Sequence, residues 1–120
     1  MNPIKTLIVV KSQFEGIHSW PDCPHEDVSF LRHPHRHVFH VTLKIKVSHD
    51  DRELEFIKVK RELENALAIL YYDVYHKNEG LGSKSCEMIA KEIGSFFASF
   101  PVHMISVFED NESGAEIYFS

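Results

Sequence analysis

Histidine is the residue type that stands out in this sequence, because nine of the 120 residues are histidines and two of them are spaced for metal binding. His35 and His37 lie two apart in an alternating segment, and side chains two apart on a strand point to the same face. Two neutral imidazoles and a third from elsewhere make an open zinc site, and the third could be His18 or His33. The alternative is a histidine-rich loop with two ordinary, partly exposed imidazoles, since His-x-His also arises by chance.

Acidic residues provide a second indication of chemistry. Glu109 shares the face of a predicted strand with Ile105 and Val107, and a carboxylate placed there must be paired or kept neutral. It could accept two N–H donors from a guanidine-like ring edge. The alternative is that the strand ends there and Glu109 reaches water. Glu87 has a structural explanation, because acidic residues favour the first turn of a helix.

The two cysteines are too few for a disulfide scaffold. Cys86 lies at a predicted helix N-terminus, where the helix dipole can lower the pKa of a thiol. Cys23 lies in a long loop near His18 and His25. Either could act as a nucleophile or a base, although a cysteine without a reactive neighbour is more often inert.

The elements that must position these side chains follow from hydrophobic periodicity. Apolar residues with period two predict strands, and apolar residues at helical spacing predict helices. The predicted strands are residues 4–14, 35–47, 103–109 and 115–119, and the helical stripes are Val59, Leu63, Ala66, Leu67 and Leu70, then Ile89, Ile93, Phe96, Phe97 and Phe100. An irregular loop covers residues 18–34. Ser83 or Ser85 can cap the second helix, and Pro101 ends it.

The order strand, strand, helix, helix, strand, strand predicts an α+β domain over residues 1–120, with two helices on one face of a four-stranded antiparallel sheet. The open edges and apolar surface of such a sheet favour self-assembly. A net charge of −5 argues against binding nucleic acid through its phosphates. No apolar run is long enough to span a bilayer, and no signal peptide is evident, so we expect a soluble, cytoplasmic protein without a membrane partner.

Five segments in this order resemble the family of 6-pyruvoyltetrahydropterin and 6-carboxytetrahydropterin synthases, the T-fold pterin enzymes. They are Phe14–His18 (the family's Phe-x-Ala-x-His), His35–Phe39 (His-Gly-His-x-Tyr, with Arg36 for glycine), Glu55–Lys60 (Asp-Phe-x-x-Leu-Lys), Ser85–Ala90 (Thr-x-Glu-x-x-Ala) and Phe108–Asp110 (x-Glu-Thr). No single segment is specific, but the five together cover nearly the whole chain in the right order.

The resemblance implies a set of roles. In the family, the histidines matching His18, His35 and His37 bind zinc, and the glutamate matching Glu109 anchors the amino-pyrimidine edge of a pterin. Residues matching Ser85 and Glu87 line the same pocket. The fold is the T-fold, whose sheets close into a barrel on trimerisation, and trimers often stack into hexamers. The implied function is a zinc-dependent lyase or synthase of pterin or 7-deazaguanine (queuosine) biosynthesis that acts on dihydroneopterin triphosphate or a related pterin.

The sequence departs from the family where protons are transferred. The family's catalytic cysteine precedes its His-x-His, and here the nearest positions hold Ser29 and Leu31. The positions that match the family's Asp-His pair fall near Tyr71 and Tyr72. The catalytic Cys and the Asp-His pair are therefore missing, and Cys23 and His76 are the candidates to replace them.

Two alternatives to an enzyme follow from these departures. The first is a catalytically altered pterin- or purine-binding protein that acts as a sensor, carrier or sequestering module. The second is a structural oligomer with a vestigial site.

Overall fold

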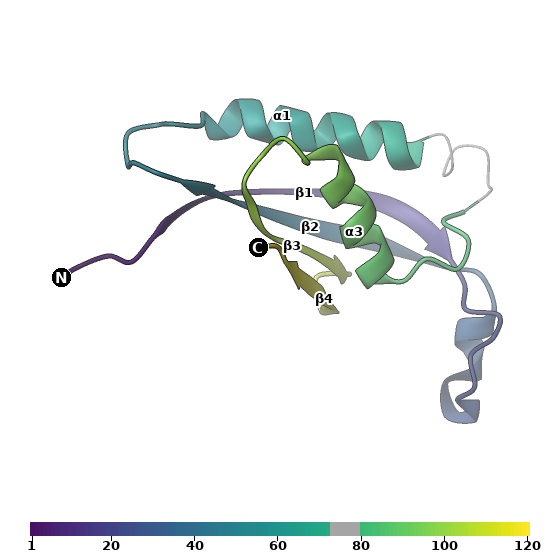
Figure 1. Cartoon of the computed structure of the whole chain (residues 1–120). Helices are drawn as coiled ribbons and strands as arrows, with labels where there is room; N and C mark the ends of the chain where they lie inside the picture. Colours follow the sequence, from purple (N-terminus) through teal and green to yellow (C-terminus); the bar gives the residue numbers. More distant parts are fainter. Residues whose placement is uncertain (73–79) are drawn as a thin grey trace.

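The protein is an α+β domain built on an open, four-stranded antiparallel sheet. The computed structural model describes residues 1–72 and 80–120. The strands are β1 (Thr6–His18), β2 (His35–Val47), β3 (Val102–Glu109) and β4 (Ser113–Tyr118). They lie in the order β1-β2-β3-β4, and each pairs antiparallel with its neighbour (Figure 1). The edges of the sheet are therefore β1 and β4.

Among the described residues, two α-helices cover one face of this sheet (Figure 1). Helix α1 (Phe56–Leu67) packs on β1 and continues into a π-helical turn, η2 (Ala68–Tyr72). Helix α3 (Cys86–Phe96) packs on β3 and β4. A short 3-10 helix, η1 (Glu26–Arg32), lies between β1 and β2 and extends away from the body of the domain. No helix within the described ranges is long and apolar enough to cross a membrane.

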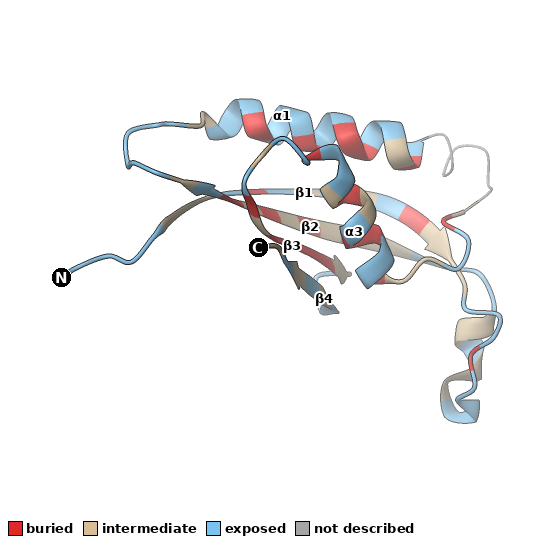
Figure 2. Ribbon diagram, viewed as in Figure 1, coloured by how far each residue is buried: buried red, intermediate tan, exposed pale blue. Residues whose placement is uncertain are grey.

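The core lies between the sheet and the two α-helices, and β2 shows how the sequence builds it. Alternate residues of β2 point toward the helices. Phe39, Val41, Leu43 and Ile45 among them are buried, and Val47 at the end of the strand is partly exposed (Figure 2). The intervening side chains lie on the uncovered face and are partly exposed. Strand propensity, alternation and burial agree here, so the bounds of β2 are those that the sequence predicts.

Most of each helical stripe is buried, and Leu70 and Phe100, which lie beyond the ends of the two α-helices, are partly buried against the core. Val59, Leu63, Ala66 and Leu67 of α1 are buried, as are Ile89 and Ile93 of α3 and Phe97 beyond its end. The prediction that Phe96 joins this stripe is wrong, because its side chain is 41% exposed. The α-helix ends at Phe96 and the chain leaves helical geometry at Phe97, so Phe97 turns toward the core instead.

Strand β1 is longer at its end than the sequence predicts. It runs to His18, because residues 6–18 pair without a break with residues 35–47. The irregular segment is correspondingly shorter, and it contains η1, which the sequence did not predict. The extension matters for the site, since it makes His18 a strand residue.

Candidate metal centre

The register of the sheet brings three histidines together beyond the end of the apolar core. His18, the last residue of β1, pairs directly with His35, the first residue of β2. His37 follows on the same face of β2, and Glu109, which ends β3, pairs with Phe39. The site therefore forms where β1 and β3 end and β2 begins. Its four side chains come from these three neighbouring strands.

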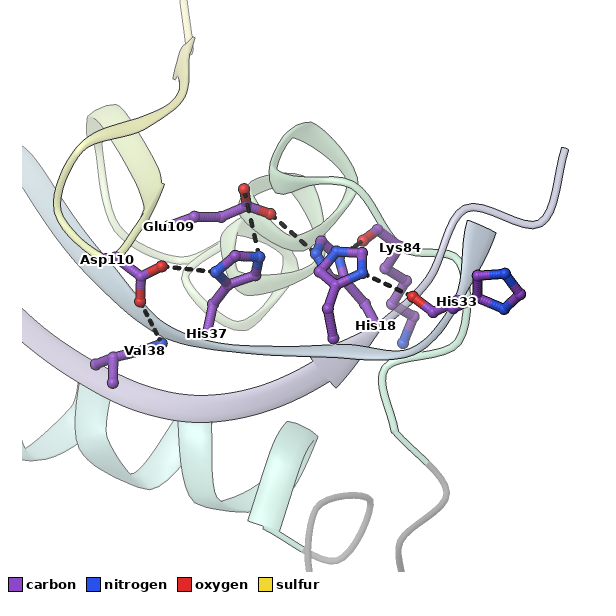
Figure 3. A network of polar contacts seen from close by, with 8 residues as sticks. His18, His33, His37, Val38, Lys84, Glu109 and Asp110 are labelled. Atoms are coloured by element: carbon purple, nitrogen blue, oxygen red, sulfur yellow. Dashed lines mark hydrogen bonds and ion pairs between the residues drawn. The ribbon is translucent and has the colours of Figure 1, made fainter. Parts of the chain in front are cut away.

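The imidazole rings of His18, His35 and His37 lie close together, and Figure 3 shows those of His18 and His37 beside Glu109. One ring nitrogen from each of His18, His35 and His37 lies within 4.8 Å of the others. The ring centroids of His18 and His35 are 4.5 Å apart, and those of His35 and His37 are 5.1 Å apart. Three nitrogens bound tetrahedrally to zinc lie ~3.3 Å from one another, so a small inward movement of these rings would suffice.

Each ring is held through its Nδ1 atom by an oxygen that can only accept a hydrogen bond (Figure 3). His18 Nδ1 lies 2.9 Å from the carbonyl oxygen of Lys84, and His35 Nδ1 lies 2.8 Å from that of His33. His37 Nδ1 lies 2.7 Å from a carboxylate oxygen of Asp110. Because carbonyl and carboxylate oxygens do not donate, Nδ1 must carry the proton in all three rings. In a neutral ring this leaves the lone pair on Nε2, which is the form that binds metals.

Glu109 faces the same point from β3. Its Oε2 atom is 2.9 Å from His18 Nε2, and its Oε1 atom is 3.8 Å from His37 Nε2. The 2.9 Å contact lacks the geometry of a hydrogen bond, so His18 Nε2 is buried without a hydrogen-bond partner among the described residues. A buried polar atom normally has a partner. A cation held by the three imidazoles would supply one.

The donor set therefore fits a divalent metal. Three imidazole nitrogens with a fourth position facing a cavity are the ligands of an open zinc site. The outer contacts fit as well, since metal-binding histidines almost always donate their other N–H to a carbonyl or carboxylate. The metal site inferred from the spacing of His35 and His37 is thus geometrically possible, with His18 in the third position.

A cavity of about 520 Å³ opens beside the histidines and would hold a small molecule. His18, His35 and Glu109 line it together with residues from the start of α3 and from the loop after β1. The other lining residues are Ser19, Trp20, Leu31, Ser83, Lys84, Ser85, Cys86, Glu87, Met88, Ser113 and Gly114.

Ser85 and Glu87 both line this cavity, as the resemblance implies. Ser85 also has a structural role, because its side chain caps α3 by accepting a hydrogen bond from the backbone N–H of Met88 at 3.2 Å. Of the two candidate N-caps, Ser83 and Ser85, the structure selects Ser85. Glu87 lies in the first turn of α3, where a carboxylate is favoured whether or not it meets a ligand.

Cys86 lines the cavity, but it is not an activated thiol. Burial, together with the negative charges of Glu109 and Glu87, raises the pKa of the Cys86 thiol to about 12. The sequence suggested the opposite shift through the helix dipole. Burial and two carboxylates outweigh the dipole here, so the thiol stays protonated at neutral pH.

The remaining candidates lie apart from the histidines or outside the described residues. Cys23 is a buried residue of the loop after β1, where its thiol contacts the carbonyl oxygen of His25 at 3.8 Å, and it does not line the cavity. The side chain of His33 is exposed, and only its backbone carbonyl contributes, by holding His35. His76 belongs to residues 73–79, which the structure does not describe.

Asp110 is a residue at the site to which sequence reasoning gave no role. One of its oxygens holds His37, and the other accepts the backbone N–H of Val38 at 3.1 Å. These contacts hold its pKa below the usual range for a carboxyl. Its position next to Glu109 was the available signal, but a polar residue after a strand usually indicates only a turn.

Comparison with known proteins adds information about the fold alone. No protein-family model matches the chain, and no curated protein matches it. Among solved structures, the crystal structure of an uncharacterized protein from Wolinella succinogenes is similar, with a TM-score of 0.67 and 13% sequence identity. The match covers 98% of this chain and 100% of that one.

Proposed function

We propose that this protein is a zinc-dependent T-fold enzyme similar to the 6-carboxytetrahydropterin synthases, acting on dihydroneopterin triphosphate or a related pterin. The observation that carries the proposal is the shared state of His18, His35 and His37. All three have Nδ1 bonded to an accepting oxygen and a ring nitrogen directed at a common point. Such agreement among three rings is expected of a site arranged for a metal and not of scattered surface histidines.

The chain's own residues would bind and orient the molecule beside the metal. Glu109 lines the cavity, and its carboxylate would accept paired N–H donors from an amino-pyrimidine edge. Ser85 and Glu87 contribute from the start of α3. A zinc ion held by the histidines would polarise oxygens on the side chain of the bound heterocycle.

A binding protein without catalysis is the second candidate, and it also has specific support. No activated thiol accompanies the three histidines in the part of the chain that the structure describes, since Cys23 lies elsewhere and Cys86 is held protonated. Without a group that moves protons, much of a lyase's rate would be unexplained. The same cavity would then serve a sensor, carrier or sequestering protein for a pterin or purine-like molecule.

One pair of measurements separates these candidates. Zinc-loaded protein is incubated at high concentration with dihydroneopterin triphosphate, and new pterin products are sought by chromatography. Calorimetry then measures the affinity for the same molecule. Product formation supports the enzyme, and tight binding without product supports the binding protein.

Glu109→Gln tests whether the pocket is the binding site, with Glu112→Gln as a control on the exposed turn that follows β3. We expect the first change to weaken binding of the heterocycle at least tenfold, because one carboxylate oxygen becomes a donor. We expect the second to leave it unchanged. Equal affinity in both variants would remove the pocket from the proposal, and no binding by the unaltered protein would refute both candidates.

A further inference from the structure

We propose that Asp110 is a positioning residue for His37, which fixes that ring in the tautomer and orientation that leave Nε2 free for the metal. The inference rests on the proposed metal centre, but it assigns a role to a residue to which the resemblance gives none. The family has threonine at the matching position, and a hydroxyl cannot replace a carboxylate with two accepting oxygens.

The geometry shows Asp110 fastened to β2 at three points. Its Oδ2 atom is 2.7 Å from His37 Nδ1, and its Oδ1 atom is 3.1 Å from the backbone nitrogen of Val38. Its own N–H donates to the carbonyl oxygen of Val38 at 2.8 Å. The carboxylate is therefore fixed relative to the strand that carries His37, and it can hold the ring in one orientation (Figure 3).

Both partners of the Asp110 carboxylate are N–H donors, so the residue at this position needs two acceptor oxygens. Val38 can only donate through its backbone nitrogen, and His37 Nδ1 donates in the metal-binding tautomer. An asparagine at this position has a single acceptor oxygen, so it can satisfy only one of the two. If its amide group faced His37, the ring would move its proton to Nε2 and lose the lone pair that would bind the metal.

A turn function explains the residue type only in part. Asp110 has φ +53° and Asn111 has φ +57°, and aspartate and asparagine are among the residues that tolerate this left-handed region. That requirement would be met equally by asparagine or glycine. It does not account for the two carboxylate oxygens, each of which is directed at a different donor on β2.

His37 is also the one ring of the three whose orientation depends on a side chain. His18 and His35 donate to the backbone carbonyls of Lys84 and His33. A substitution cannot remove those acceptors, but it can remove Asp110. Asparagine and glycine both tolerate the positive φ of Asp110, so either substitution should leave the fold intact.

The test compares Asp110→Asn and Asp110→Gly with Glu112→Gln, which removes a charge from the same turn. Zinc affinity is measured by competition with a coloured chelator, and nitrogen-15 NMR of the metal-free proteins at mildly alkaline pH reports the tautomer of His37. We expect zinc affinity to fall about 10–100-fold in both Asp110 variants and not in the control. We expect the His37 ring of Asp110→Asn to lose its preference for the Nδ1–H form, with the thermal unfolding midpoint little changed.

The NMR measurement needs no metal, so it tests the role of Asp110 separately from the metal centre. If the tautomer of His37 is the same in all variants, the inference is overturned, whatever happens to zinc affinity. If the tautomer changes as expected but the unaltered protein binds no zinc, the positioning role stands and the proposed metal centre fails.

Discussion

Cys86 illustrates, at the scale of one residue, how two local effects compete. A helix N-terminus stabilises a negative charge by about 0.3–1 kcal/mol at an exposed position. Burial of the thiol acts in the other direction, and the carboxylates of Glu109 and Glu87 add to it. The result is a pKa of about 12, well above that of an ordinary cysteine.

We therefore predict that Cys86 of the metal-free, folded protein resists alkylation by iodoacetamide at neutral pH. Its rate should keep rising as the pH increases past 10, because the thiolate fraction grows until the pH reaches the pKa of about 12. Peptide mass spectrometry against the unfolded chain measures the rate. A rate that levels off near pH 8.5, where a free thiol titrates, would contradict the assigned environment.

The sequence predicts the clustered histidines better than the residues that hold them in place. His35 and His37 follow from period two within one strand, which is a local property. The choice of His18 over His33 needs the resemblance, because spacing alone does not specify which residue of β1 lies opposite His35. Asp110 was not predicted, since its contact with His37 depends on the register between β2 and the turn after β3.

At the scale of elements, α1 is defined by its buried face. Leu63 is fully buried, whereas Ile57 on the same helix is 56% exposed. We predict that Leu63→Ala lowers the free energy of unfolding by about 2–5 kcal/mol, through lost burial and the cavity that it leaves. Ile57→Ala, the control, should change it by about 0.5 kcal/mol or less. Urea unfolding followed by circular dichroism measures both, and similar losses would show that the helix packs on another face.

The turn between residues 80 and 82 holds the end of β1 in place. Leu81 N–H donates to the carbonyl oxygen of Ile17 at 2.5 Å, and Ser19 N–H donates to that of Gly82 at 3.0 Å. His18 lies between these two anchors. Gly80 and Gly82 have φ +69° and +64°, and a Cβ on Gly80 would lie 2.8 Å from the Ile17 carbonyl oxygen, whereas one on Gly82 would meet nothing within 4 Å.

These two glycines provide a matched pair of substitutions. Alanine at either position should cost about 1–2 kcal/mol of stability from backbone strain. Only Gly80→Ala should also weaken zinc binding, because its Cβ displaces the backbone next to His18. Thermal unfolding and zinc competition measure the two effects. Equal zinc affinity in both variants would mean that the turn does not position His18.

Elements with strong periodicity were predicted well, and their ends were not. β2 was predicted over its whole length because its alternation is unbroken. The end of β1 was not, because residues 15–18 extend only by pairing with β2. Phe96 was misassigned because helical spacing continues through it in the sequence, while the helix itself ends there.

At the scale of the whole molecule, the chain is extended for its length. Its radius of gyration is 16.0 Å, whereas about 13–14 Å is typical of a compact domain of this size. Within residues 1–72 and 80–120, one face of the sheet carries no helix, and β1 and β4 are its edges. Unpaired edges are usually covered, and assembly is one way to cover them.

We accordingly predict that the protein forms a trimer or a hexamer in solution, as the T-fold proposal requires. Strand pairing between copies would close the sheets into a barrel and remove the open edges. Light scattering coupled to size-exclusion chromatography measures the mass at several concentrations. A stable monomer would contradict the barrel. It would not affect the histidine site, whose residues all come from one chain.

Zinc binding by the metal-free protein tests the proposed metal centre. A chelator competition is run on the unaltered chain, on His35→Ala and on His40→Ala, since His40 lies on the same strand but on the uncovered face. We predict that the unaltered protein and His40→Ala bind one zinc ion per chain tightly, and that His35→Ala loses at least ~100-fold in affinity, more than an outer-shell change would cost. Absence of tight binding by the unaltered protein, or equal affinity in the two variants, would contradict the proposed metal centre.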